Sequence, residues 1–565
     1  MKKLIVLTLT LVLSIFSLKA HAQDPLEEGI GLLQKNDCTG ALKLLRRAVS
    51  DRPNSEKANL YLGNAFLCLN TPDSAEVYLK KAVNIDEELA PAYYGLGRAY
   101  MSQKKYAEAI NNFNQAITND AKSEEYVISL GNAYLAADSL DQATQAFYKA
   151  HDMDDKDPRA LAGIADVYRA QNIFDPAIEY YKNALALDST SIEIRLKLAN
   201  TYLKNNNGAG AYEQFLKVSE LAPNNPQGQY QAGDLLYVNK RYKEAFPFLQ
   251  KYHELDSTDN KALFELADDA YNAHLFDDAV RYFQEYLSKN PNSLEAKKSL
   301  AASFYFEKQP MESYNLYKSM PIDSMNVREL VRYGLAANAV HDTAMTIETW
   351  SRAVKLDTTL SEIEYFLANT LFAAKRYNEA IEHFQKRLAL DSNDVAARLN
   401  MGLCYFIIEN YQQAVAALRK VVELKPDNYQ GNLWLARALI FDDSLESAKD
   451  VYQSFIKIAA SDTSSNHSSD LNEAYRQTAL YQIIAGSKLS KDRPDDAKKF
   501  YEDALRNLMI AVKYDSKEMK THALLAQDYA LMGKIDEACK EIKLVLRSDP
   551  KNDQMTKLQK SLGCE

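Results

Sequence analysis

The chain has 565 residues, of which only 18 are glycine and 15 are proline. These fractions are about half of the usual 7% and 5%, so the sequence disfavours sandwiches, barrels and doubly wound α/β folds, which need many turns and Gly-rich loops. The formal net charge of −10 comes without a block of basic residues, which argues against partners such as nucleic acids or anionic lipid surfaces.

The first 22 residues have the pattern of a signal peptide. Lys2 and Lys3 precede an apolar run over residues 4–18, and small residues follow, so we expect cleavage before Gln23. The alternative is a buried first helix. No Cys follows the apolar run to carry a lipid, and no later segment has the length and apolarity of a transmembrane helix. We therefore expect an exported protein, either periplasmic or associated with the outer membrane.

A 34-residue period fills the rest of the chain. One series of small residues recurs at this spacing with few slips: Ala41, Ala75, Ala109, Ala143, Ala177, Ala211, Ala245, Ala279, Ser313, Thr346, Ala380, Ala414, Ala448, Ala504 and Ala538. A second series lies 12 residues upstream: Gly29, Gly63, Gly97, Gly131, Ala165, Ala199, Gly233, Ala267, Ala301, Gly334, Ala368, Gly402, Ala436 and Ala526. Each repeat carries two amphipathic helical patterns separated by a polar break, which predicts a helix hairpin whose helices approach most closely at the small residues.

This signature resembles the tetratricopeptide repeat (TPR). The third repeat carries its marks at Tyr93, Leu96, Gly97, Tyr100, Ala109, Phe113 and Ala116. The resemblance implies an all-α fold, a right-handed α-α superhelix of about 15 hairpins, in which the first helix of each hairpin lines a concave face. Leu-Asp-Ser and Leu-Asp-Thr sequences between repeats, such as 187–189, are expected to end one helix and to provide the N-cap oxygen of the next.

Two interruptions in the period predict the organisation of the array. The period shortens near residue 321, and the spacing between Ala448 and Ala504 grows to 56 residues around a Ser-rich run. The expected segments are repeats one to nine at 23–320, repeats ten to thirteen at 321–460, a surface loop at 461–470, an extended hairpin with the final repeat at 471–552, and a capping helix at 553–565.

Four of the five cysteines fall at the two ends of the array. By phase, Cys38 and Cys68 lie on neighbouring helices at the same end of the solenoid, and Cys539 and Cys564 do likewise in the last repeat and its cap. Each pair could form a disulfide that restrains a terminal hairpin, or all four could be small apolar fillers. Cys404 is expected to be buried and unpaired.

No sequence motif indicates a catalytic, cofactor-binding or metal site, so we expect a protein that is not an enzyme. No two histidines stand three or four residues apart, and the Asp-rich segment 151–157 lacks the central Gly and final Glu of a calcium loop. TPR enzymes carry a separate catalytic domain, for which this chain leaves no room.

The concave face is the expected binding surface. Two adjacent repeats place aromatic, Asp and aromatic residues there: Tyr230, Asp234 and Tyr237, then Phe264, Asp268 and Tyr271. Other inward positions are Tyr94, Arg98, Asn132, Asp166, Asn200, Tyr305, Tyr365, Asn369 and Phe372. Rings with fixed acceptors suit an extended peptide carrying Lys or Arg, or a glycan. Alternatively, the rings pack laterally against the next repeat. The carboxylate clamp of TPR co-chaperones is not expected, because Leu60 and Leu196 stand where it needs cations.

These features favour an exported scaffold that binds other envelope proteins or peptides. Two alternatives stay open: an accessory protein that binds or helps to process glycans, and a subunit of an outer-membrane assembly or secretion complex.

Overall fold

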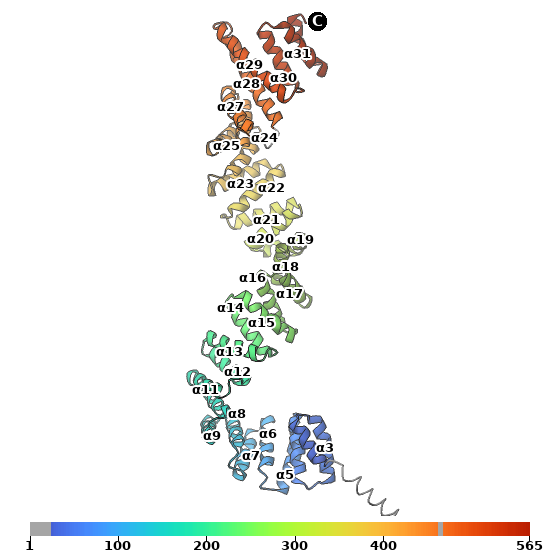
Figure 1. The fold of residues 1–565 in the computed structure, drawn as a ribbon, viewed down its shortest axis with the longest axis vertical. Helices are drawn as coiled ribbons and strands as arrows, with labels where there is room; N and C mark the ends of the chain where they lie inside the picture. Colours follow the sequence, from blue (N-terminus) through green and yellow to red (C-terminus); the bar gives the residue numbers. More distant parts are fainter. Residues whose placement is uncertain (1–23, 462–466, 565) are drawn as a thin grey trace, which may run out of the picture. The chain divides into compact units, whose positions relative to one another are not determined.

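The structure, a computed structural model, describes residues 24–461 and 467–564, and every regular element in these ranges is helical (Figure 1). The predicted all-α fold class is confirmed. The expected signal peptide lies outside the described residues. The chain divides into two compact units, unit 1 up to Tyr282 and unit 2 from Phe283, and each is described by itself.

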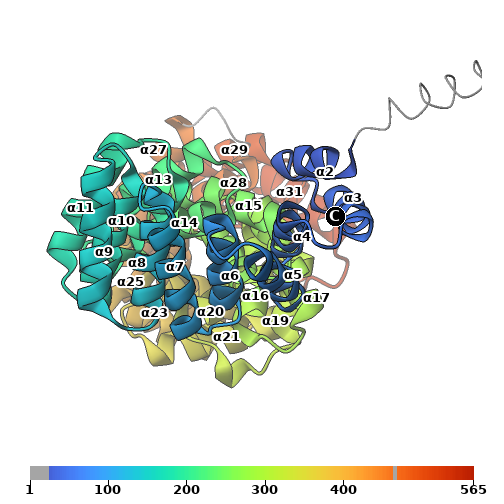
Figure 2. The ribbon, with the colours of Figure 1, turned by 90° about the horizontal axis from the view of Figure 1, so that it is seen from below.

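Unit 1 consists of helix hairpins in chain order. Their helices are α2 (Pro25–Gln34), α3 (Cys38–Asp51), α4 (Glu56–Cys68), α5 (Pro72–Ile85), α6 (Ala90–Ser102), α7 (Tyr106–Asn119), α8 (Glu124–Ala136), α9 (Leu140–Met153), α10 (Pro158–Ala170), α11 (Phe174–Leu187), α12 (Ile192–Lys204), α13 (Gly208–Leu221), α14 (Pro226–Val238), α15 (Tyr242–Leu255), α16 (Asn260–Asn272) and α17 (Phe276–Lys289), the last of which crosses the division between the units. Consecutive helices pack together, as Figure 2 shows for α4 to α7.

Unit 2 continues the same pattern. It contains α18 (Leu294–Phe306), α19 (Pro310–Lys318), the 3₁₀ helix η2 (Ile322–Ser324), α20 (Val327–Ala339), α21 (Thr343–Leu356), α22 (Ser361–Ala373), α23 (Tyr377–Leu390), α24 (Val395–Ile407), α25 (Tyr411–Leu424), α26 (Tyr429–Phe441), α27 (Leu445–Ser461), α28 (Ser468–Leu489), α29 (Pro494–Tyr514), α30 (Met519–Leu531), α31 (Ile535–Ser548) and α32 (Asp553–Leu562). Over the described ranges, α2 to α31 form fifteen hairpins and α32 follows the last.

The phased small residues lie at the contact between the two helices of each hairpin. Every residue of the downstream series, from Ala41 to Ala538, is completely buried. At Gly97 an added Cβ would lie 2.4 Å from the ring of Phe113, sixteen residues later on the second helix, and the same clash recurs between Gly131 and Phe147. Small residues are therefore required at this phase because the two helices approach too closely for a side chain.

In fourteen of the fifteen hairpins of the described ranges, all except α28 and α29, the turn carries one residue with positive φ, seven positions after the upstream small residue. Thirteen of these turns use a residue other than glycine, from Asn36 to Asp443, while the last hairpin uses Gly533 with φ 72°. A single left-handed residue reverses the chain between the helices, and Asn or Asp tolerates it better than most residues.

The connections between hairpins differ from the sequence expectation. Asp188 ends α11, and its side chain accepts from the backbone N–H and the hydroxyl of Thr190, 2.9 and 2.8 Å away. The N-cap of α12 is Ser191 instead. The sequence 187–189 ends α11 as predicted, but it does not provide the N-cap oxygen of α12, because an Asp carboxylate readily bonds its own turn two residues on.

The predicted loop at 461–470 was too long. Helix α27 runs through Ser461 and α28 begins at Ser468, so the extended hairpin starts before residue 471, and residues 462–466 lie outside the described part of the chain. Ser468 to Asp470 form the first turn of α28, where Ser and Asp are favourable residues. The helices of this hairpin, α28 and α29, have 22 and 21 residues, which accounts for the lengthened spacing.

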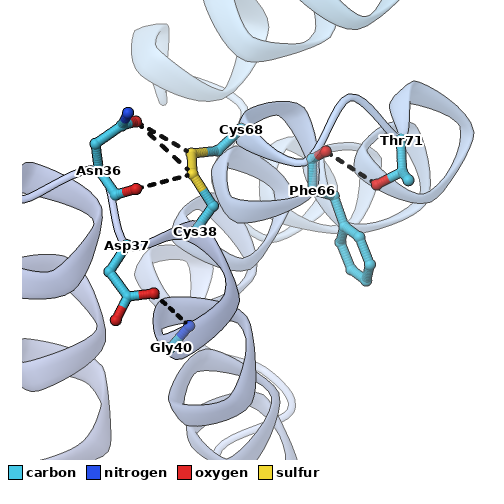
Figure 3. The surroundings of a disulfide bond; sticks show 7 residues. All are labelled: Asn36, Asp37, Cys38, Gly40, Phe66, Cys68 and Thr71. Atoms are coloured by element: carbon cyan, nitrogen blue, oxygen red, sulfur yellow. Dashed lines mark hydrogen bonds between the residues drawn. A yellow bond between two sulfur atoms is a disulfide. The ribbon is translucent and has the colours of Figure 1, made fainter.

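Both cysteine pairs form disulfides. Cys38 begins α3 and is bonded to Cys68 at the end of α4, with 5.7 Å between their Cα atoms, and Figure 3 shows the side-chain oxygen of Asn36 beside both sulfurs. Cys539 on α31 is bonded to Cys564, with Cα atoms 5.5 Å apart. The first bond joins the terminal hairpin to the first helix of the next hairpin, and the second joins the last hairpin to the segment after α32. Each therefore restrains a hairpin that has a neighbouring hairpin on one side alone.

Candidate functional site

The first helices of successive hairpins contact one another, as α4 does α6, α8 does α10 and α14 does α16. This places them on the inner side of the curve, so we call the surface of α2, α4, α6, α8, α10, α12, α14 and α16 the concave face of unit 1. Side chains bridge neighbouring first helices across 31 positions: the Tyr94 hydroxyl donates to Glu125 at 2.9 Å, and the Lys197 ammonium donates to Asp166 at 2.9 Å.

The predicted ring of Tyr230 is engaged within the protein. Its hydroxyl lies 3.1 Å from Glu265 and 2.7 Å from the Lys261 ammonium, both on the next first helix, and its ring centroid is 4.9 Å from that of Tyr252. Burial raises the pKa of Tyr230 to about 12. The Glu265 charge acts in the same direction, whereas the hydrogen bond with Lys261 opposes the shift. The Tyr230 hydroxyl thus reaches the next repeat, as the alternative interpretation expected, while its ring packs against Tyr252 of its own hairpin.

The side chains of Tyr237 and Asp268 are also engaged in contacts within the protein. The Tyr237 hydroxyl donates to Asp268 at 2.8 Å, and the Asn272 side chain donates to the same carboxylate at 2.9 Å. Asp268 is therefore an acceptor already in use. Asp234 is half-buried and its burial raises the pKa of its carboxyl, although Lys261 opposes the shift.

Three predicted rings pack edge-on across the turn of their own hairpin. Tyr237 contacts Tyr242, Tyr271 contacts Phe276 and Phe372 contacts Tyr377, at centroid distances of 5.9, 5.9 and 5.7 Å. Sequence reasoning missed this pairing, although its signal is the aromatic residue that opens the second helix, five positions after the ring. Phe264 on α16 is likewise half-buried.

The remaining predicted residues lie apart from this stretch. Tyr365 and Asn369 are on α22 in unit 2, where the Arg387 guanidinium lies 5.9 Å from the Tyr365 ring and Asn369 accepts from Asn400 at 2.7 Å. Tyr94 and Arg98 are on α6 in unit 1, with the Arg98 guanidinium 5.7 Å from the Tyr94 ring. The structure therefore distributes the predicted residues over several hairpins and does not gather them at one place within either unit.

A cavity of about 690 Å³ opens instead on the concave face between α8, α10 and α12. Its floor includes Ala162, three positions before the upstream small residue of its repeat. The other seven repeats of unit 1 have a large side chain at this position: Leu26, Leu60, Tyr94, Ile128, Leu196, Tyr230 and Phe264. The cavity lies where this side chain is missing, a signal that is visible in the sequence once the phase is known.

Charged side chains surround this cavity. Asp166 on its wall is nearly buried and accepts from the Tyr181 hydroxyl at 2.5 Å, from Arg169 at 3.0 Å and from Lys197. Arg159 is paired with Asp157 at 2.7 Å and with Glu125. These ion pairs hold the walls in place and use the hydrogen-bonding capacity of Asp166 within the protein.

A second concave cavity of about 570 Å³ lies between α2, α4 and α6. Ile30, Leu33 and Leu67 supply apolar surface, and Arg98 supplies a positive charge to its lining. Cys68 also lines it, so the first disulfide borders this cavity.

Among the described residues, two aspartate carboxyl groups are fully buried and have no hydrogen-bond partner for either oxygen. These are Asp269 on α16 and Asp528 on α30. Both stand two positions after the upstream small residue, where other repeats have Ala65, Ala99 or Ser303. Burial raises the pKa of Asp269 to about 8, with added repulsion from Asp268, and that of Asp528 to about 7.

The described residues include no group of three or more His, Cys, Asp or Glu side chains arranged to hold a metal ion. Within the same ranges, no helix combines the length and apolarity needed to cross a membrane. Cys404 is buried, which raises the pKa of its thiol to about 12.

Family models of the tetratricopeptide repeat match residues 26–93, 90–122, 128–192, 169–232, 264–308 and 408–463, together more than half of the chain. The chain is a tetratricopeptide-repeat protein. A further family model, described as anaphase-promoting complex, cyclosome, subunit 3, matches residues 340–421 of this TPR chain.

Among curated proteins, the TPR chain is similar to Hsp70-Hsp90 organizing protein 3 of Arabidopsis thaliana, with 21% identity over 197 residues that cover 32% of the chain and 35% of that protein. The chain thus spans about a third of the length of this relative. Among solved structures, a thermophilic TPR protein of Thermus thermophilus is 21% identical, with 32% of this chain and 98% of that chain covered and a TM-score of 0.29. The C-terminal part of a TPR repeat-containing protein from Cytophaga hutchinsonii is 21% identical, with 46% and 99% covered and a TM-score of 0.35.

Proposed function

We propose that this TPR protein is an exported scaffold that holds partner proteins of the bacterial envelope on the concave face of unit 1. The observation that carries the proposal is the cavity between α8, α10 and α12, which is open, lined from three successive first helices and large enough for a partner's side chain. A protein segment that crosses the first helices would place one residue in this cavity and its backbone against the neighbouring polar side chains.

Two independent features support export. The N-terminal sequence has the pattern of a cleavable signal, and four of the five cysteines are joined in disulfides. Disulfides persist in oxidising compartments such as the periplasm and are rare in the cytosol. A periplasmic or outer-membrane-associated location is therefore the proposal.

The glycan alternative receives less support than protein binding. Stacking on a sugar needs an exposed ring face, whereas Tyr230, Tyr237 and Tyr271 are half-buried and in contact with rings of their own hairpins. A subunit of an outer-membrane assembly or secretion complex would be one specific form of the proposed scaffold.

Crosslinking and affinity capture from intact cells tests the proposal. Tagged protein is crosslinked, captured from the envelope fraction and compared with the variant Ala162→Tyr, which places a large side chain in the concave cavity. We expect defined partner proteins with the wild type and their loss with the variant. Recovery of the tagged protein in the cytosolic fraction would contradict export, and partners retained by Ala162→Tyr would contradict the assigned surface.

A further inference from the structure

We propose that the cavity between α8, α10 and α12 receives a lysine or arginine side chain from an extended segment of the partner protein. This inference rests on the proposed function and deepens it, because it specifies what the concave face recognises.

The cavity opens at a repeat position where a large side chain is missing. Ala162 replaces the large residue that the other seven repeats of unit 1 carry at its position, and Gly163 beside it cannot fill the space, because an added Cβ would lie 2.3 Å from the ring of Phe147. Protein interiors and interfaces pack densely, so an open hollow in an otherwise regular surface is suited to a side chain from outside.

The charge of the lining selects a cation. Six carboxylates line the cavity, namely Glu125, Asp154, Asp157, Asp166, Asp188 and Glu193, against the three cations Lys156, Arg159 and Lys197, which gives 3 − 6 = −3. Two of these cations are already used, since Arg159 pairs with Asp157 and Glu125, and Lys197 pairs with Asp166 and Glu193. A further cation from the partner would reduce the excess, whereas an acidic residue would add to it.

Two of the carboxylates are placed to meet that cation. Asp154 accepts from the backbone N–H of Lys156 at 2.9 Å, and Asp188 accepts from the N–H and hydroxyl of Thr190. These are bonds within a turn, and the described residues supply neither carboxylate with an ion pair. Each keeps acceptor capacity for a cation, because an ionised carboxylate has about four lone-pair sites.

The rest of the lining suits the stem of a long cationic side chain. Ile128, Ala162 and Ile194 supply apolar surface, and Ser129 and Asn132 supply donors and acceptors for the backbone of the segment. Lysine and arginine bury their methylene stems along apolar surface and keep the charged head at a polar rim. A neutral glycan would use neither the apolar floor nor the negative charge.

The test uses peptide pools with one fixed residue. Fluorescein-labelled seven-residue peptides carry Lys, Arg, Gln or Glu at the centre and an equal mixture of uncharged residues elsewhere, and binding to the chain from residue 23 onward is followed by fluorescence anisotropy. We expect the Lys and Arg pools to bind about tenfold tighter than the Glu pool, with a preference that falls as salt is added.

Two sets of variants locate the preference. Ala162→Tyr narrows the cavity with a residue that the third and seventh repeats already carry at this position. Ala523→Tyr makes the same change at the same repeat position in unit 2 as a control. We expect the first change to abolish the preference and the second to leave it intact. Asp154→Asn with Asp188→Asn keeps both turns and removes two charges, so the preference should fall about threefold to tenfold.

The outcomes separate this inference from the proposed function. Equal binding of all pools that Ala162→Tyr still weakens would overturn the cation preference and leave concave-face binding in place. A preference for the Lys and Arg pools that survives Ala162→Tyr would place the cation elsewhere and overturn the inference. Absence of binding by every pool would also overturn it, while the capture of partners from cells decides the proposed function independently.

Discussion

Replacing Asp528 by serine is expected to stabilise the last hairpin, α30 and α31. The Asp528 carboxyl is fully buried, neither of its oxygens has a hydrogen-bond partner, and burial raises its pKa from 3.8 to about 7 despite the opposing charge of Lys534. Serine is already used at this repeat position, where the Ser303 hydroxyl donates to the carbonyl of Ser299 at 2.8 Å.

The magnitude follows from the shift. An acid whose pKa is higher in the folded than in the unfolded state costs no stability below pH 3.8, costs more as the pH rises to about 7, and has a constant cost above that. At about 1.4 kcal/mol per pH unit the ceiling is about 4 kcal/mol. Relaxation around the charge lowers this, so we expect the Asp528→Ser change to raise the free energy of unfolding of the hairpin by about 2 to 4 kcal/mol at pH 7.

Hydrogen exchange read by mass spectrometry measures this locally, which a repeat array requires because its hairpins need not unfold together. Protection of residues 519–548, corrected for the intrinsic exchange rate, should rise in the variant at pH 7 and match the wild type at pH 4. Residues 395–424 serve as an internal control. Protection that is equal in the variant and the wild type at both pH values would contradict this expectation. Lower protection of the variant than of the wild type at pH 7 would contradict it as well.

Three further changes are expected to act through single contacts. Gly97→Ala should destabilise the third hairpin by about 1 to 3 kcal/mol in urea unfolding, because the new Cβ would meet the Phe113 ring at 2.4 Å, whereas Gly31→Ala, with open space around it, should be neutral or stabilising. Cys564→Ser opens a bond that spans 25 residues and should cost the C-terminal hairpin about 3 kcal/mol, seen as faster proteolysis that reductant reproduces in the wild type. Tyr237→Phe removes a donor to a half-buried carboxylate and should cost about 1 kcal/mol in thermal unfolding, and an unchanged midpoint would contradict this.

The fold was predictable because the same residue pattern recurs in every repeat, so each repeat supports the same structural prediction. A small residue every 34 positions identifies the contact between two helices, and the complete burial of Ala109 and Ala143 is the physical form of that pattern. The period also shows at which end of the solenoid each helix begins. Cys38 and Cys68 were therefore predicted to lie close together, and they form a disulfide.

The site was harder to predict because its signals lie in departures from the pattern. Rings such as Tyr237 were assigned to the concave face by phase, but whether a ring faces solvent depends on neighbours like Tyr242 and on partners like Asp268. The cavity arises from what Ala162 lacks, and a search for aromatic and charged residues does not detect a missing side chain. Asp528 is similar, since only its phase shows that a carboxyl replaces a buried alanine or serine.

Site-specific photocrosslinking tests the central claim, which is that partners dock on the concave face of unit 1. In one strain, benzoylphenylalanine replaces Asn132, an exposed residue of the cavity lining on α8. In a matched strain it replaces Gln145, an exposed residue of the second helix α9. We expect discrete crosslinked proteins from the Asn132 position and none of them from Gln145. The same products from both positions, or products from Gln145 alone, would contradict it.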